Sequence, residues 1–165
     1  MTGASGGGGG VGPEKADPSW YGCVVPADLL YDVEQHVWVR LEDGEAVLGM
    51  TDVAQTMGGK VVSITWKPPG KTVKRGRWLA VIESAKWVGP FPAPLTCEIV
   101  ATNEAGFDRD ILIANRDPYG DGWLFRVRPT ALEAERGHLV DGPAALERYK
   151  EFIQREDVRC FRCAD

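Results

Sequence analysis

Short β-branched segments separated by Gly and Pro turns are the feature that most restricts how this chain can fold. Strand-like stretches occupy residues 36–42, 45–50, 60–66, 77–84, 93–100 and 123–129. Asp43-Gly44 lies between the first two stretches, and this dipeptide is typical of a hairpin turn. Many short strands joined by tight turns predict a mainly β fold, a β-sandwich or flattened barrel with short helices. Trp123 opens the last strand and is expected in the core.

Two parts of the chain have a helical pattern. Residues 51–59 predict a short helix that Thr51 can cap and Gly58 can end. Near the C-terminus, residues 130–133 fit a capping box, and Pro143 suits the first turn of a longer helix. Apolar residues then recur at three- and four-residue spacing, which predicts an amphipathic helix packed on the domain: Leu146, Tyr149, Phe152 and Ile153.

The length of 165 residues and a net charge of −5 bound the class of protein. We expect one domain over residues 19–130, preceded by a disordered Gly-rich lead at 1–18 and followed by a helical extension at 131–165. The acidic balance argues against nucleic acid as a partner. The sequence shows neither an apolar run of membrane-spanning length nor a signal peptide, so we expect a cytoplasmic protein that does not bind membranes.

Lys86 lies between two strand-like stretches, in the sequence Glu83-Ser84-Ala85-Lys86-Trp87. The strand over 77–84 leads into it, the stretch over 93–100 leads away, and the intervening residues are rich in Pro and Gly, which cannot continue a central strand. Lys86 is therefore expected at the tip of a reversal, exposed to solvent. A solvated turn lysine without function is the alternative that these residues alone leave open.

Several motifs in the same order resemble those of the glycine cleavage system H-protein family. They are His36-x-Trp-Val39, Gly49-x-Thr-Asp-x-Ala-Gln55, Gly70-x-x-Val-x-x-Gly76, Glu83-Ser-x-Lys86 with Ala93-Pro94 seven residues beyond the lysine, and Asn115-x-Asp-Pro-Tyr-Gly-x-Gly-Trp-Leu124. The resemblance covers residues 31–128. It implies a lipoyl-domain-like barrel-sandwich hybrid and a carrier without enzymatic activity of its own.

The resemblance implies lipoic acid as the cofactor, joined by an amide to Lys86. A lipoate ligase or lipoyl transferase would install it, and Glu83 and Ser84 would serve the recognition by that enzyme. Bonding to nearby backbone amides is the alternative role of these two residues. Methionines flank the lysine in the related biotin carriers, and Ala85 and Trp87 do not fit that pattern.

Trp87-Val88-Gly89-Pro90 departs from the small residues that usually follow the lysine in H proteins. Trp87 offers an apolar ring that can cover the lipoyl arm. This departure and the terminal segments resemble the lipoate-binding proteins of the heterodisulfide-reductase-like sulfur oxidation pathway. That resemblance implies a sulfur-bound cargo and, as partners, a heterodisulfide-reductase-like complex, sulfur-transfer proteins and dihydrolipoamide dehydrogenase. Glycine cleavage, with an aminomethyl cargo, is the alternative, and we expect a monomer in either case.

Four cysteines are present: Cys23, Cys97, Cys160 and Cys163. In a reducing cytosol we expect free thiols rather than a disulfide framework. The spacing of Cys160 and Cys163 fits a redox pair, so a thiol-redox module is a further hypothesis for the function. A lone CxxC supplies only two zinc ligands, and no metal site or catalytic constellation is predicted. His36 and His138 are expected to be structural or surface residues.

Overall fold

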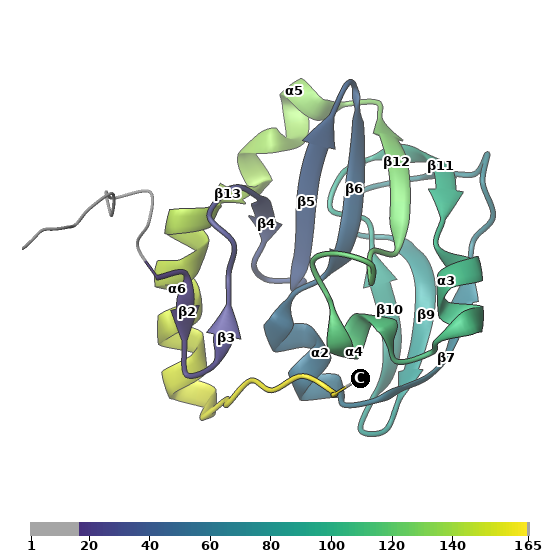
Figure 1. Ribbon diagram of the computed structural model, residues 1–165. Helices are drawn as coiled ribbons and strands as arrows, with labels where there is room; N and C mark the ends of the chain where they lie inside the picture. The colour runs from purple at the N-terminus through teal and green to yellow at the C-terminus, as the bar shows by residue number, and fades with distance from the viewer. Residues whose placement is uncertain (1–16, 165) are drawn as a thin grey trace, which may run out of the picture.

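The computed structural model of the protein describes residues 17–164. Most of the Gly-rich lead expected at residues 1–18 therefore lies outside the described residues. Strands form a large sheet of order β13-β4-β5-β6-β12-β11-β8, a small sheet of order β10-β9-β7, and the β2-β3 ribbon (Figure 1). Each strand pair in this part of the chain is antiparallel.

The bounds of the elements, in chain order, show short strands throughout. The strands are β2 (Ser19–Trp20), β3 (Cys23–Val24), β4 (Leu30–Asp32), β5 (Val37–Glu42), β6 (Glu45–Met50), β7 (Val61–Trp66), β8 (Thr72–Val73), β9 (Trp78–Ser84), β10 (Val88–Pro92), β11 (Cys97–Thr102), β12 (Phe125–Pro129) and β13 (Val140–Asp141). The helices are α2 (Asp52–Gly58), α3 (Glu104–Arg109), α4 (Ile113–Arg116), α5 (Leu132–Glu135), the 3₁₀ turn η2 (Arg136–His138) and α6 (Gly142–Glu156).

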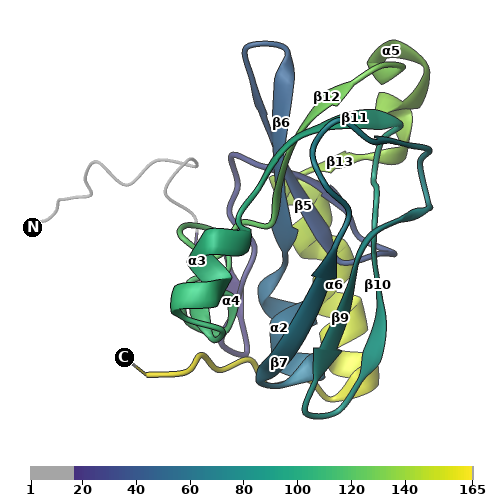
Figure 2. The ribbon, with the colours of Figure 1, turned by 90° about the vertical axis from the view of Figure 1, so that its right-hand side faces the viewer.

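The main core lies between the two sheets. Phe91 of the small sheet stacks on Phe125 of the large sheet, with ring centroids 6.0 Å apart. Trp66 of the small sheet also contacts Phe125, at 5.4 Å. Figure 2 shows the small sheet, β7, β9 and β10, standing in front of the large one. The predicted mainly β sandwich or flattened barrel with short helices and a C-terminal helix is confirmed.

A second apolar cluster covers the other face of the large sheet. Val37, Trp38 and Val39 are all fully buried, so β5 is enclosed on both faces. The helix α6 supplies Tyr149 to this cluster, beside Trp38 and residues of the N-terminal segment. In Figure 1, α6 lies along the left of the molecule, next to β2, β3 and β4. The predicted packing of the amphipathic helix on the domain is confirmed.

The predicted hairpin over residues 36–50 is confirmed as β5–β6. Glu42 pairs with Glu45 across its turn. Asp43 and Gly44 have positive φ angles of 50° and 81°, the conformation that a two-residue hairpin turn requires and that Asp-Gly adopts readily. The β6 strand then leads directly into α2, the helix beside which Lys86 lies.

The first helix boundary differs from the prediction by one residue. Thr51 caps α2 as expected, since its hydroxyl accepts the N–H of Ala54 at 3.2 Å. Gly58, predicted to end the helix in a left-handed conformation, is still helical, and Gly59 takes the positive φ of 78°.

The capping box predicted at residues 130–133 is wrong. The helix α5 begins at Leu132 and has no side-chain cap. The N–H of Thr130 instead donates to the carbonyl of Thr96 at 3.0 Å, because the pairing of β12 with β11 continues to this residue.

Trp123 is half-buried and contacts the second cluster. Its expected place in the core is therefore wrong. The fully buried residues of this segment are Leu124 and Phe125.

Candidate functional site

Lys86 lies at the tip of the β9–β10 hairpin, and its side chain is exposed. Three residues, 85–87, connect the two strands. The predicted exposure at a reversal is therefore confirmed. The predicted partner strand is wrong, because β9 pairs with Val88–Pro92 rather than with residues 93–100. The small sheet ends at β10, and an edge strand tolerates Pro where its missing N–H faces away from the neighbour.

Two hydrogen bonds between Ser84 and Trp87 close the tip. The carbonyl of Trp87 accepts both the N–H of Ser84 at 2.8 Å and its hydroxyl at 3.1 Å. Ser84 is 8% exposed, so the turn role that the sequence allowed is the one this geometry favours. Glu83 remains exposed and accepts the Ser63 hydroxyl at 3.1 Å.

A second set of backbone bonds ties the tip to the end of α2. The N–H of Lys86 donates to the carbonyl of Gly58 at 3.1 Å, and the N–H of Ala85 donates to that of Lys60 at 2.9 Å. The Lys86 side chain passes over Gly59, so that a Cβ added there would lie 3.2 Å from Cε of Lys86. The backbone of Lys86 is therefore fixed, whereas its side-chain amine is exposed to solvent.

Asn115 holds the backbone that follows α2 in place. The sequence did not single it out as a site residue. It is 2% exposed. Its Nδ2 donates to the carbonyl of Gly59 at 2.9 Å, and its Oδ1 accepts the N–H of Val61 at 3.0 Å. The available signal was its position at the head of the motif that ends at Leu124, but the role depends on which backbone the fold brings to it.

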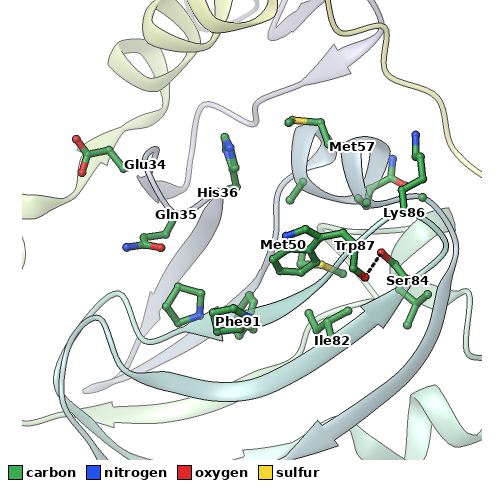
Figure 3. A pocket seen from close by; sticks show the side chains of 17 residues that line it. Glu34, Gln35, His36, Met50, Met57, Ile82, Ser84, Lys86, Trp87 and Phe91 are labelled. Atoms are coloured by element: carbon green, nitrogen blue, oxygen red, sulfur yellow. Dashed lines mark hydrogen bonds between the residues drawn. The ribbon is translucent and has the colours of Figure 1, made fainter. Parts of the chain in front are cut away.

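A cavity of about 360 Å³ adjoins the lysine, between the β9–β10 hairpin, α2 and the loop before β5. This volume lies within the range of small-molecule sites. Figure 3 shows Lys86 on one side of the cavity, His36 on the other, and the Trp87 ring between them, beside Met50. Its lining is largely apolar and includes Met50, Met57, Ile82, Trp87 and Phe91. Sequence patterns gave no indication of this cavity.

His36 borders the cavity as a structural residue. Its Nδ1 lies 3.0 Å from the hydroxyl of Tyr149, and burial lowers the pKa of its imidazole. His138 is exposed. Trp87 is 46% exposed, and its ring stands at the rim of the cavity (Figure 3).

The prediction of free thiols is wrong for two of the four cysteines. Cys23 and Cys160 form a disulfide that joins segments 137 residues apart, so Cys160 and Cys163 are not paired with each other. The N–H of Cys160 donates to the carbonyl of Tyr21 at 3.1 Å, which brings the C-terminal segment against the N-terminal ribbon. Cys163 is half-buried with a free thiol. Cys97 is buried, as expected, and burial raises the pKa of its thiol to about 12.

Within residues 17–164, no group of three or more His, Cys, Asp or Glu side chains is placed to bind a metal ion. The helices of the same part of the chain are all too short or too polar to cross a bilayer.

Comparisons with known proteins agree on one family. The family model described as "Glycine cleavage H-protein" matches residues 29–155. "Glycine cleavage system H protein 2" of Aquifex aeolicus is 49% identical over 148 residues, which cover 89% of this chain and 91% of that protein. "Probable glycine cleavage system H protein 2" of Sulfolobus acidocaldarius is 43% identical over 143 residues, covering 85% and 95%.

The fold agrees as well. The crystal structure of a glycine cleavage system H protein from Mycobacterium marinum superposes with a TM-score of 0.66 at 33% identity, over 76% of this chain and 98% of that one. The chain therefore belongs to the glycine cleavage H-protein family, whose members are lipoyl carrier proteins rather than enzymes and hold lipoate covalently on a lysine.

Proposed function

We propose that Lys86 is the lysine that carries the lipoyl group. The observation that supports this assignment is an exposed lysine at a backbone position that hydrogen bonds hold in place. The N–H of Lys86 binds the carbonyl of Gly58, and the N–H of Ala85 binds the carbonyl of Lys60, at the end of α2. A modifying enzyme can reach the amine, and the fixed backbone holds the base of the side chain in one position. Acylation converts the ammonium into a neutral amide.

The cavity beside Lys86 fits the group that such an arm bears. Its lining includes Ile82 and Phe91, and Trp87 stands at its rim. An apolar cavity can shelter a hydrophobic dithiolane from water. The bound lipoyl group supplies a disulfide that can be reduced to two thiols. The protein's own residues fix the point of attachment and offer this resting place.

The names of the relatives favour an aminomethyl group as cargo. The matched proteins of Aquifex aeolicus and Sulfolobus acidocaldarius are named as glycine cleavage system H proteins. We propose that this chain serves the same system, with glycine decarboxylase, aminomethyltransferase and dihydrolipoamide dehydrogenase as partners. A lipoate ligase or lipoyl transferase would install the arm, and the exposed Glu83 is available for recognition by that enzyme.

Sulfur transfer is the second candidate, and one observation favours it. Three cysteines, Cys23, Cys160 and Cys163, lie on the two terminal segments that hydrogen-bond to α2, the helix to which Lys86 is anchored. A disulfide and a free thiol near a lipoyl arm suit a sulfur-bound cargo, with a heterodisulfide-reductase-like complex and sulfur-transfer proteins as partners. The comparisons support glycine cleavage more directly, so sulfur transfer ranks second.

The proposed carrier is a cytoplasmic monomer. Residues 19–130 would form the carrier domain, and the extension at 131–165 would serve the placement of its C-terminal cysteines.

Intact-mass measurement tests the site of attachment. We expect protein produced with active lipoylation machinery to gain the mass of one lipoyl group, and Lys86→Arg to gain none. Lys60→Arg is the matched control, because Lys60 is exposed and adjacent but contributes only its backbone carbonyl to the tip. An adduct that persists in Lys86→Arg would refute the assignment.

Glycine–bicarbonate exchange tests the cargo. The lipoylated protein should support the exchange catalysed by glycine decarboxylase, and Lys86→Arg should not. If fully lipoylated protein fails in this assay, glycine cleavage is excluded in favour of the sulfur candidate.

A further inference from the structure

The C-terminal segment, residues 158–164, is bound to the same helix end as Lys86. It leaves α6 and runs past α2 (Figure 1). The carbonyl of Phe161 accepts from Nε2 of Gln55 at 2.8 Å and from the hydroxyl of Thr56 at 3.3 Å. Thr56 and Gly58, which accepts the N–H of Lys86, are two residues apart and so lie within one helical turn. The tail and the lysine are therefore neighbours.

The disulfide lies at the beginning of this tail. Cys23 is fully buried, whereas Cys160 is half-buried, so Cys160 is the more accessible of the two residues. Gly22 allows the close approach, because a Cβ added to it would lie 2.6 Å from the carbonyl oxygen of Cys160. Position 22 must therefore be glycine for the Cys160 backbone to approach this closely.

Contacts other than the disulfide also hold the two cysteine segments together. Asp52 is 1% exposed. Its carboxylate accepts the N–H of Val24 at 2.9 Å and pairs with Arg162 at 3.3 Å, so it bridges the residue after Cys23 and the tail. The N–H of Cys163 donates to the carbonyl of Asn115 at 3.0 Å. Breaking the disulfide would therefore leave its two sulfurs near each other, as reversible exchange requires.

We propose that the Cys23–Cys160 disulfide is an internal exchange site for the reduced lipoyl arm. The carrier can then hold one electron pair on the two cysteines and a second on the lipoyl dithiol. The inference rests on the proposed attachment of lipoate to Lys86. Its ligand is a dithiol, and its chemistry is thiol–disulfide exchange. In compartments that keep thiols reduced, a disulfide of this kind is usually catalytic or redox-sensing rather than structural.

The exchange is balanced in two steps. Cys160 accepts the attack of one arm thiolate, the Cys23–Cys160 bond breaks, and Cys23 leaves as a thiolate that takes up a proton. Cys160 then leaves in the same way when the second arm thiol closes the dithiolane. The arm is oxidised by two electrons, the cysteine pair is reduced by two, and the two protons of the dithiol end on Cys23 and Cys160.

The reach of the arm is compatible with this transfer. A lipoyl-lysine extends about 14 Å from its Cα at bond lengths near 1.5 Å. Cys160 is bonded directly to Phe161, which binds Thr56, and Thr56 lies two residues before the Gly58 carbonyl that accepts the N–H of Lys86. Figure 3 shows the Lys86 amine directed out of the cavity, past the end of α2, and the tail binds α2 at Thr56. A tethered reactant has an effective concentration in the mM range.

Cysteine labelling tests the proposal. Lipoylated protein is treated with NADH and dihydrolipoamide dehydrogenase, quenched in acid, alkylated in denaturant and digested. We expect the peptides of Cys23 and Cys160 to become alkylated at a rate independent of protein concentration. Cys97 and Cys163 are free thiols and serve as constant internal references. This readout does not depend on the activity of the carrier in any pathway.

Unlipoylated Lys86→Arg protein is the matched control, because it keeps the disulfide and lacks the arm. When free dihydrolipoamide is supplied at about 10 µM, the Lys86→Arg protein should lose its disulfide about a hundredfold more slowly than lipoylated protein, whose tethered dithiol has an effective concentration in the mM range. A reduced arm beside an intact disulfide, or equal rates in the two proteins, would overturn the inference alone. Absence of lipoate from Lys86 would overturn the proposed function, and the inference with it.

Discussion

Gly59→Ala should destabilise the protein and impair its modification, because Gly59 has a conformation that side chains rarely tolerate. Its backbone has φ 78° and ψ −164°, a region that is essentially restricted to glycine and costs other residues of order 1–3 kcal/mol. The new Cβ would also lie 3.2 Å from Cε of Lys86 and 3.6 Å from Cβ of Ala85. We therefore expect the free energy of unfolding to fall by about 1–3 kcal/mol, with displacement of the hairpin tip.

Urea denaturation and the initial rate of lipoylation measure the two effects. With a slope of about 2 kcal/mol per M, the midpoint should fall by roughly 0.5–1.5 M. Loss of one tip hydrogen bond costs about 1 kcal/mol, which lowers the population of the acceptor conformation about fivefold, and the lipoylation rate should fall by that factor.

Gly70→Ala is the control for backbone strain alone. Gly70 has φ 93°, and a Cβ there meets nothing within 4 Å. It should lose stability without slower lipoylation. Wild-type lipoylation of Gly59→Ala, or equal slowing in both variants, would contradict the assigned role of Gly59.

Three further predictions concern the surroundings of the site. Asn115→Ala should lower the free energy of unfolding, measured by urea denaturation, by about 2–4 kcal/mol, since it leaves the buried N–H of Val61 and the carbonyl of Gly59 without partners. Unchanged stability would show that water replaces Asn115 as their partner. Burial lowers the pKa of His36, so the unfolded state binds its proton more readily, and stability should be complete above about pH 6.5 and decline below it; thermal melts of His36→Asn should lose much of that decline. Cys23→Ser opens a loop of 137 residues, which chain entropy values at up to about 5 kcal/mol; equal melting of wild type with and without reductant would contradict this contribution.

The strands, the β5–β6 hairpin and the exposure of Lys86 could be predicted because each depends on local chemistry. Asp43-Gly44 specifies its turn by the positive φ that both residues adopt. The partner of β9 could not be predicted in the same way. Pro90 and Pro92 excluded a central strand, but they are compatible with the edge position that β10 has in the small sheet, and edge position is a property of the whole sheet.

The cysteine pairing and the role of Asn115 depend on contacts between distant segments. The spacing of Cys160 and Cys163 favoured the wrong pair, because Cys23 is 137 residues from its partner. The true pair is brought together by contacts between distant segments, among them the backbone bond from Cys160 to Tyr21 and the Asp52 carboxylate that binds Val24 and Arg162. Nothing in the local sequence around either cysteine encodes these contacts. Asn115 belonged to a recognised motif, but the carbonyl of Gly59 that it binds becomes apparent only in the folded chain.

Trp87 illustrates how such a site can accept change without losing its geometry. The tip uses only the backbone of this residue, since its carbonyl accepts both bonds from Ser84. The root of Lys86 is likewise held through the carbonyls of Gly58 and Lys60. The Trp87 side chain adds an exposed ring at the rim of the cavity. The ring covers Gly89, because a Cβ added there would lie 2.3 Å from it. The backbone bonds of the tip therefore do not depend on the side chain at position 87, whereas Gly59 is constrained by its φ angle of 78°.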